Sequence, residues 1–189
     1  MWHPLELPYR SLPGFSERLI SDHYQLYLQY LGRWDDLHHL FIPEAVEAED
    51  RFALRRLVSE EGMLRNAVRL HELYFENLVP GGAGDPRQIF EESLDEWERE
   101  FRMLALASTG WVVYAVDDAS GRDFTFTMQD HAQGFVACAS PLLVLDVYEH
   151  AFTRDFGIDK EDYYDAFMNN VDWNRVAERA ETRRLIAER

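Results

Sequence analysis

The chain has 189 residues, of which 47% are apolar and 14% are aromatic, so it is long enough to bury a hydrophobic core. Its formal net charge of −16 disfavours nucleic acid and anionic membranes as partners, because both would be repelled at long range. The single cysteine, Cys138, excludes an intramolecular disulfide and a thiolate metal cluster. Residues 1–4 lack a signal-peptide pattern and no run approaches the ~20 apolar residues of a membrane span. We therefore expect a soluble, cytoplasmic protein.

The first helix is expected after Ser16, a suitable N-cap residue. Apolar residues follow it at steps of three and four up to Leu31, which is the period of a helix with one buried face, and His23 lies on that apolar stripe. Residues 35–53 are less periodic and are interrupted by Pro43, so we expect a turn there and the start of a second helix.

A longer helix is expected from about Ser59 to Leu78, and His71 lies on its apolar stripe. The clearest break follows at residues 80–86, where three glycines and two prolines occur within seven positions. We take this break as the boundary between an N-terminal α-hairpin domain, residues 1–80, and a C-terminal domain, residues 86–189.

In the C-terminal part, some segments have the hydrophobic periodicity of helices and others that of strands. One helix is expected first, then three strands of a small antiparallel sheet, and then further helices that are broken near Asn169-Asn170. The predicted fold is α+β and mostly α: a long α-hairpin followed by an α/β domain with a three-stranded antiparallel sheet. The expected elements are helix 89–108, strands 111–116, 124–128 and 142–147, and helices 150–156 and 160–186.

Asp146 and His150 are candidate metal ligands. They lie four residues apart, directly after the apolar run 141–145, and both side chains are expensive to bury unless something binds them. His23 and His71 would complete a set of three imidazoles and one carboxylate, which suits iron, manganese or zinc and leaves a position for a small substrate.

A single histidine on an apolar helix face is more often a hydrogen-bonded core residue than a metal ligand. The spacing alone therefore leaves both readings open for His23 and His71. The remaining histidines with polar or irregular neighbours, His3, His38 and His39, are not expected to be ligands.

Several motifs in this order resemble the iron/manganese superoxide dismutase family over nearly the whole chain. The strongest is Asp146-Val147-Tyr148-Glu149-His150-Ala151, which is similar to the family's DVWEHA signature with tyrosine in place of tryptophan. The other matching segments are Leu7-Pro8-Tyr9, His71 to Leu78, Gly110-Trp111, Asp162-Tyr163 and Asp165 to Trp173.

The resemblance implies one iron or manganese ion per subunit, bound by His23, His71, Asp146 and His150 with a solvent molecule as fifth ligand. It also implies an enzyme that converts superoxide to O2 and hydrogen peroxide by cycling the metal between 3+ and 2+.

The resemblance further implies a residue that hydrogen-bonds the metal-bound solvent. The position four residues before His71 is Ala67, which cannot donate a hydrogen bond, so the donor is expected to be Gln129 or His131. Tyr27 stands where the family has a gateway histidine, and Tyr30 is the candidate for a proton-relaying tyrosine.

Two further positions carry implied roles. Glu149 corresponds to a glutamate that reaches across a twofold interface, so a homodimer is expected. Lys160 stands where the family has an arginine that attracts superoxide, and such a local charge would offset the acidic background.

The residues around the implied ligands differ from the family pattern. Leu31 replaces the usual proton-relaying tyrosine and Thr153 replaces an interface tyrosine, while Phe75, Tyr148 and Val113 replace tryptophans. An atypical or slow superoxide dismutase is therefore one hypothesis. The alternatives are a related iron or manganese redox enzyme that acts on another small oxidant, oxyanion or organic substrate, and a non-catalytic metal-binding interaction protein.

Overall fold

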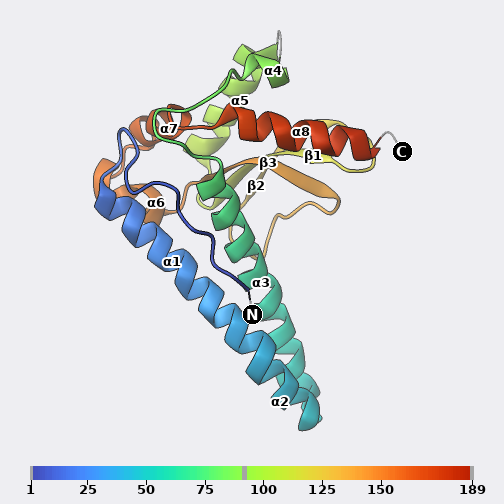
Figure 1. Cartoon of the computed structure of the whole chain (residues 1–189). Coiled ribbons are helices and arrows are strands. Elements are labelled where there is room, and N and C mark those ends of the chain that lie inside the picture. Colours follow the sequence, from blue (N-terminus) through green and yellow to red (C-terminus); the bar gives the residue numbers. More distant parts are fainter. Residues whose placement is uncertain (1, 91–92, 188–189) are drawn as a thin grey trace.

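The computed structural model describes residues 2–90 and 93–187, and it places a long helical hairpin beside a part built on a three-stranded sheet (Figure 1). The expected fold class, mostly α with a three-stranded antiparallel sheet in the C-terminal part, is confirmed. None of the described helices is long and apolar enough to cross a membrane. In chain order, the elements are α1 (Glu17–Asp36), η1 (Leu37–Phe41), α2 (Ile42–Glu47), α3 (Arg51–Glu76), α4 (Arg87–Phe90), α5 (Leu94–Ala107), β1 (Trp111–Asp117), β2 (Asp123–Met128), β3 (Ala139–Asp146), α6 (Glu149–Phe156), α7 (Lys160–Met168) and α8 (Trp173–Ala187).

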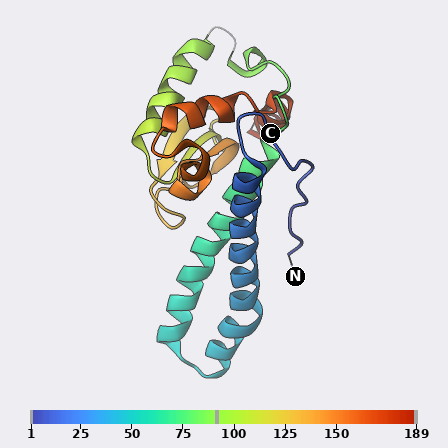
Figure 2. The ribbon, with the colours of Figure 1, turned by 90° about the vertical axis from the view of Figure 1, so that its left-hand side faces the viewer.

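The hairpin consists of α1 and α3, which lie side by side and extend away from the sheet (Figures 1 and 2). The Ser16 hydroxyl accepts a hydrogen bond from the Leu19 amide at 3.0 Å, so the expected N-cap of α1 is confirmed. The turn expected within residues 35–53 is present at Ala48 and Glu49, and the second long helix starts in the same range, at Arg51. Pro43 itself lies in the first turn of α2.

The second long helix begins eight residues before the expected start at Ser59. Its N-cap is Asp50, whose carboxylate accepts hydrogen bonds from the amides of Phe52 and Ala53. The first turns of α3 bury little apolar surface, since Phe52 is 75% exposed. The apolar stripe therefore starts later than the helix does, which is why hydrophobic periodicity placed the start too late.

The sheet has the order β2-β1-β3 with both pairs antiparallel. The central strand β1 is buried along nearly its whole length, and its first residue, Trp111, pairs with Met128 of β2 and Asp146 of β3. Helices α3 and α8 pack against β3, and α8 lies across the sheet in Figure 1. This register brings the carboxylate at the end of β3 beside the indole at the start of β1.

The break expected near Asn169-Asn170 separates α7 from α8 and is confirmed. The Asn170 side chain fixes this corner, because its amide donates to the carbonyls of Pro13 and Ala166 and its oxygen accepts from the Gly81 amide. The helix expected over 89–108 is instead two helices, α4 and α5. The boundary at residues 80–86 falls in the connection between α3 and α4, and the division into two domains stays a prediction.

Gly110 is required where β1 starts. A Cβ atom at this position would collide with the Met128 carbonyl oxygen and lie 2.7 Å from that of Gln129, and the Gly110 carbonyl itself accepts from the Val147 amide at 2.8 Å. Only a residue without a side chain lets the ends of β1, β2 and β3 approach this closely.

We expect Gly110→Ala to destabilise the protein by about 2 to 3 kcal/mol, because backbone atoms surround the new methyl group and cannot move aside. Thermal unfolding followed by circular dichroism should show a Tm lowered by roughly 5 to 10 °C. The control is Gly32→Ala in α1, where nothing lies within 4 Å of the added Cβ, and it should raise stability by about 0.5 to 1 kcal/mol. Equal Tm values for the two variants would contradict this role of Gly110.

Candidate metal centre

Four side chains converge between the hairpin and the sheet: His23 from α1, His71 from α3, Asp146 from the end of β3 and His150 from the first turn of α6. One ligand atom from each lies within 4.8 Å of those of the other three. The Oδ2 atom of Asp146 is 3.1 Å from Nε2 of His23, 3.0 Å from Nε2 of His150 and 3.7 Å from Nε2 of His71. Donor atoms about 2.1 Å from a common ion lie roughly 3 to 4 Å apart, so these separations suit one metal ion.

The cluster is buried and lacks part of its hydrogen bonding. Asp146 and His71 are fully buried, and His23 is 2% exposed. The Nε2 atom of His71 is buried without a hydrogen-bond partner among the described residues. A buried polar atom of this kind is rare unless it binds something. The donor set of three imidazoles and one carboxylate fits iron or manganese.

Hydrogen bonds outside the cluster aim two of the donor atoms. Nδ1 of His71 lies 2.7 Å from the Ala67 carbonyl, which can only accept, so Nδ1 carries the proton and Nε2 presents a lone pair to the cluster. The Tyr148 amide donates to Oδ1 of Asp146 at 2.9 Å, which leaves Oδ2 facing the imidazoles. Both arrangements orient the ligand atoms toward the same point.

The protonation states of His23, His71 and Asp146 are also those that a cation requires. Burial, together with His23, lowers the pKa of His71 to about 3, and burial lowers the pKa of His23. Burial would raise the pKa of Asp146, but the neighbouring His150 and His23 outweigh it, so the net shift is downward. At neutral pH the cluster therefore presents neutral imidazoles on α1 and α3 beside an ionised carboxylate, and metal binding needs this state.

His131 and Trp111 form one wall of the centre. The Trp111 indole N–H donates to Nδ1 of His131 at 3.0 Å, so Nδ1 accepts and the proton of the neutral imidazole lies on Nε2. That nitrogen is 3.4 Å from the Tyr30 hydroxyl. The rings of Trp111 and Tyr30 lie 5.0 and 5.5 Å from the ring of His71, measured between centroids. A hydrogen-bond donor and a phenol thus lie next to the four candidate ligands.

Comparison with known proteins agrees with this geometry. Residues 88–179 match the C-terminal domain of iron/manganese superoxide dismutases. The chain is 34% identical to an iron superoxide dismutase of Cupriavidus metallidurans over 187 residues, covering 93% of each protein. The chain belongs to the iron/manganese superoxide dismutase family. It is also 30% identical to an iron superoxide dismutase of Aquifex aeolicus, covering 91% of this chain and 87% of that one, and 31% identical to a manganese superoxide dismutase of Haloferax volcanii, covering 94% of each.

The two residues considered for the solvent-facing position of this family occupy different environments. Gln129 is exposed, whereas His131 is 6% exposed and faces the candidate ligands. The carboxylate of Asp130 accepts hydrogen bonds from the amides of Ala132 and Gln133 and forms a tight turn there. This turn follows β2 and directs the His131 ring inward.

The two tyrosines of α1 also differ. Tyr30 lies against His71 and His131, while Leu31 is buried in the core. The hydroxyl of Tyr27 donates to the Glu72 carboxylate at 3.0 Å and accepts from the Leu5 amide at 2.8 Å. Tyr27, four positions after His23, thus links the N-terminal segment to α3.

The positions expected at the dimer interface and the substrate entrance share one pocket. Glu149, Lys160 and Thr153 line a pocket of about 680 Å3 together with His150. Glu149 and Thr153 are exposed, and the Thr153 hydroxyl donates to the Glu149 carbonyl. Lys160 is partly buried, its ammonium group donates to the Ser108 carbonyl, and burial lowers its pKa.

The sequence analysis missed two polar residues near the centre. Glu72 is 2% exposed, and its carboxylate accepts hydrogen bonds from Trp2, Tyr27 and Arg69. Asn66 donates from Nδ2 to the His131 carbonyl at 2.8 Å and so holds the loop after β2 against α3. Glu72 could have been noticed, because it directly follows His71 in the predicted helix. The sequence around Asn66 does not indicate its contact with the loop after β2.

Proposed function

We propose that this protein is a superoxide dismutase that uses one iron or manganese ion per subunit. The observation that carries the proposal is the convergence of His23, His71, Asp146 and His150 with a buried Nε2 atom on His71 that has no partner among the described residues. Its membership of the iron/manganese superoxide dismutase family supports the same reaction.

The four side chains would hold the ion, which supplies one-electron oxidation of one superoxide and one-electron reduction of the next. The relatives include both iron and manganese enzymes, so the family supports either metal. The protein must hold the donor atoms in orientations that let them bind the ion. The Ala67 carbonyl orients His71 in this way, and the Tyr148 amide orients Asp146.

His131 is our candidate for the residue that orients solvent at the metal. Its Nε2–H is available for donation because the Trp111 indole occupies Nδ1. Tyr30, whose hydroxyl lies 3.4 Å from Nε2 of His131, would exchange protons with this group, since the reduction of superoxide to hydrogen peroxide consumes two protons. This assigns the role to His131 and leaves Gln129 on the surface.

The pocket beside His150 is our candidate entrance for superoxide. Lys160 contributes a positive charge to its wall, and such a charge attracts a small anion at short range despite the net charge of −16. Glu149 is exposed in the single chain and lines the same pocket. We infer a homodimer in which the partner covers this face, and a cytoplasmic location.

Purified protein loaded with iron or manganese should remove superoxide faster than spontaneous dismutation, as measured by pulse radiolysis or by competition with cytochrome c. Asp146→Ala should abolish both the activity and stoichiometric metal binding, because it removes the one anionic donor from a buried cluster. Asp36→Ala, which removes an exposed carboxylate at the end of α1, should retain both properties. A metal-loaded protein that does not exceed the spontaneous rate would refute the proposed function.

We expect His131→Ala to lower kcat/KM for superoxide by roughly 10- to 100-fold, because it removes the donor beside the metal while leaving all four ligands in place. His131→Gln should lose less activity, since an amide N–H can replace the imidazole N–H. Gln129→Ala should stay within about twofold of the parent protein, because its side chain is exposed. The reverse order, with Gln129→Ala the slower enzyme, would assign the role to Gln129.

A further inference from the structure

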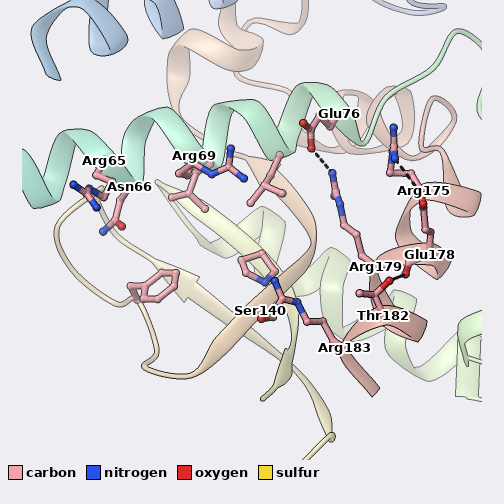
Figure 3. A pocket seen from close by; sticks show the side chains of 14 residues that line it. Arg65, Asn66, Arg69, Glu76, Ser140, Arg175, Glu178, Arg179, Thr182 and Arg183 are labelled. Atoms are coloured by element: carbon pink, nitrogen blue, oxygen red, sulfur yellow. Dashed lines mark hydrogen bonds and ion pairs between the residues drawn. The ribbon is translucent and has the colours of Figure 1, made fainter. Parts of the chain in front are cut away.

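A second pocket, apart from the metal centre, lies between α3, α8 and the start of β3 (Figure 3). Its volume is about 570 Å3, which is within the range of pockets for small molecules. Arginine is the most frequent residue in its lining, which contains Arg65, Arg69, Arg175, Arg179 and Arg183.

The spacing of these arginines explains how they meet. Arg65 and Arg69 lie one turn apart on α3, and Arg175, Arg179 and Arg183 lie at successive turns of α8. Residues four positions apart share a helix face, so the arginines of each helix form a row along one wall of the pocket. The labelled arginines in Figure 3 come from these two helices, and the labelled Ser140 comes from the start of β3.

This concentration of positive charge opposes the composition of the whole chain. The sequence has 19 Lys and Arg residues against 35 Asp and Glu residues, yet the five arginines of the pocket outnumber by one their four glutamate partners, Glu61, Glu72, Glu76 and Glu178. Like charges at short range repel unless a counter-charge is present. The lining therefore favours an anion.

Arg179 is a largely buried arginine of the pocket, and hydrogen bonds hold its side chain in place. Its side chain is only 16% exposed, and its guanidinium group donates to Glu76 at 2.7 Å, to the Leu142 carbonyl at 3.0 Å and to the Asn77 side chain. These bonds use its donors to hold α8 against α3 and β3. Arg179 therefore supplies charge and structure but is not free to change partners.

Arg175 and Arg183 are the arginines of α8 that remain available to a ligand. Arg175 pairs with Glu178 at 3.0 Å, and both side chains are more than half exposed, so this pair contributes little to stability. Arg183 is exposed, and no hydrogen bond or ion pair joins it to the side chains that the structure describes, which end at residue 183.

The arginines of α3 face the pocket from the opposite side and are held by aromatic rings. The guanidinium of Arg69 lies over the Trp2 ring and that of Arg65 over the Trp34 ring, each 5.6 Å from the ring centroid. Each also donates to one glutamate of α3. Apolar side chains separate the two rows of arginines, and they include Leu70, Leu73, Phe135 and Pro141.

We propose that this pocket binds a small multivalent phosphate anion, with Arg175 and Arg183 as the principal ligands on α8. The planar guanidinium group matches the oxygen spacing of a phosphate and donates two hydrogen bonds to it. A nucleic acid or an anionic membrane would meet the repulsion of the remaining negative surface, whereas a compact ligand contacts only the pocket. The exposed Phe135 ring and the apolar wall offer a contact for an organic group on a phosphate ester.

Isothermal titration calorimetry of the purified, metal-loaded protein with pyrophosphate and with ADP, in buffer without divalent cations, tests this proposal. We expect one site per chain for at least one probe, and a Kd at least tenfold weaker for both Arg175→Ala and Arg183→Ala. Tighter binding of ADP assigns the pocket to phosphate esters, and equal or tighter binding of pyrophosphate assigns it to the inorganic anion.

Arg99→Ala is the matched control, because Arg99 is an exposed arginine on α5 outside the pocket. It should bind both probes as the parent protein does. All three replaced side chains are exposed, so circular dichroism and Tm should match the parent, and Arg179 is left intact because it holds α8 in place. No binding of either probe, or an equal loss of affinity in Arg99→Ala, would overturn the proposal.

Discussion

An ionised carboxylate that is fully buried is the constraint on which the rest of this structure depends. Removing such a charge from water costs several kcal/mol unless other groups compensate it. Nε2 atoms of His23 and His150 lie 3.0 to 3.1 Å from Oδ2 of Asp146, but His71 cannot help, since its proton is on Nδ1. The four side chains therefore compensate one another fully only around a cation.

The architecture follows from the need to bring these four groups together from distant parts of the chain. The antiparallel hairpin supplies one imidazole from each long helix, and the central strand β1 positions the end of β3 through the pairing of Trp111 with Asp146. The close approach at Gly110 lets the three strand ends meet. The same indole that lies against His71 also fixes the proton of His131, so the fold and the chemistry of the centre share one residue.

Residues around the centre stabilise the fold of this family member. Tyr27 and Glu72 face away from the four ligands and tie the N-terminal segment, through Leu5 and Trp2, to the helical hairpin. Tyr30 supplies the phenol beside the centre, one position before Leu31. The chain is acidic as a whole, but two places in the structure carry positive charge. One is Lys160, in the pocket beside His150, and the other is the arginine-lined pocket between α3 and α8.

Much of the fold was predictable because hydrophobic periodicity records burial directly. It located α1, the three strands and the break between α7 and α8, and it placed His23 and His71 on buried faces. It placed the start of α3 too late, because the exposed first turns of this helix carry no apolar stripe. The four candidate ligands lie on regular elements or directly beside them, so periodicity could place them on buried faces, while the resemblance to the family singled them out as a set.

The choice between Gln129 and His131 was not predictable in the same way. Both residues lie in the irregular segment between β2 and β3, where no period tells which side chain points inward. Which side chain lies beside the candidate ligands depends on a turn closed by Asp130 and on a hydrogen bond from Asn66 to the His131 carbonyl, 65 positions apart along the chain. Interactions of this kind depend on the three-dimensional structure, and the local sequence does not specify them.

The central claim is that His23, His71, Asp146 and His150 hold one redox metal. X-ray absorption at the iron and manganese edges, combined with elemental analysis of natively expressed protein, tests it most directly. The account predicts one iron or manganese ion per chain, coordinated by three imidazole nitrogens and by oxygen. Protein that contains no stoichiometric metal, or a metal whose ligands do not include three imidazoles, would contradict it.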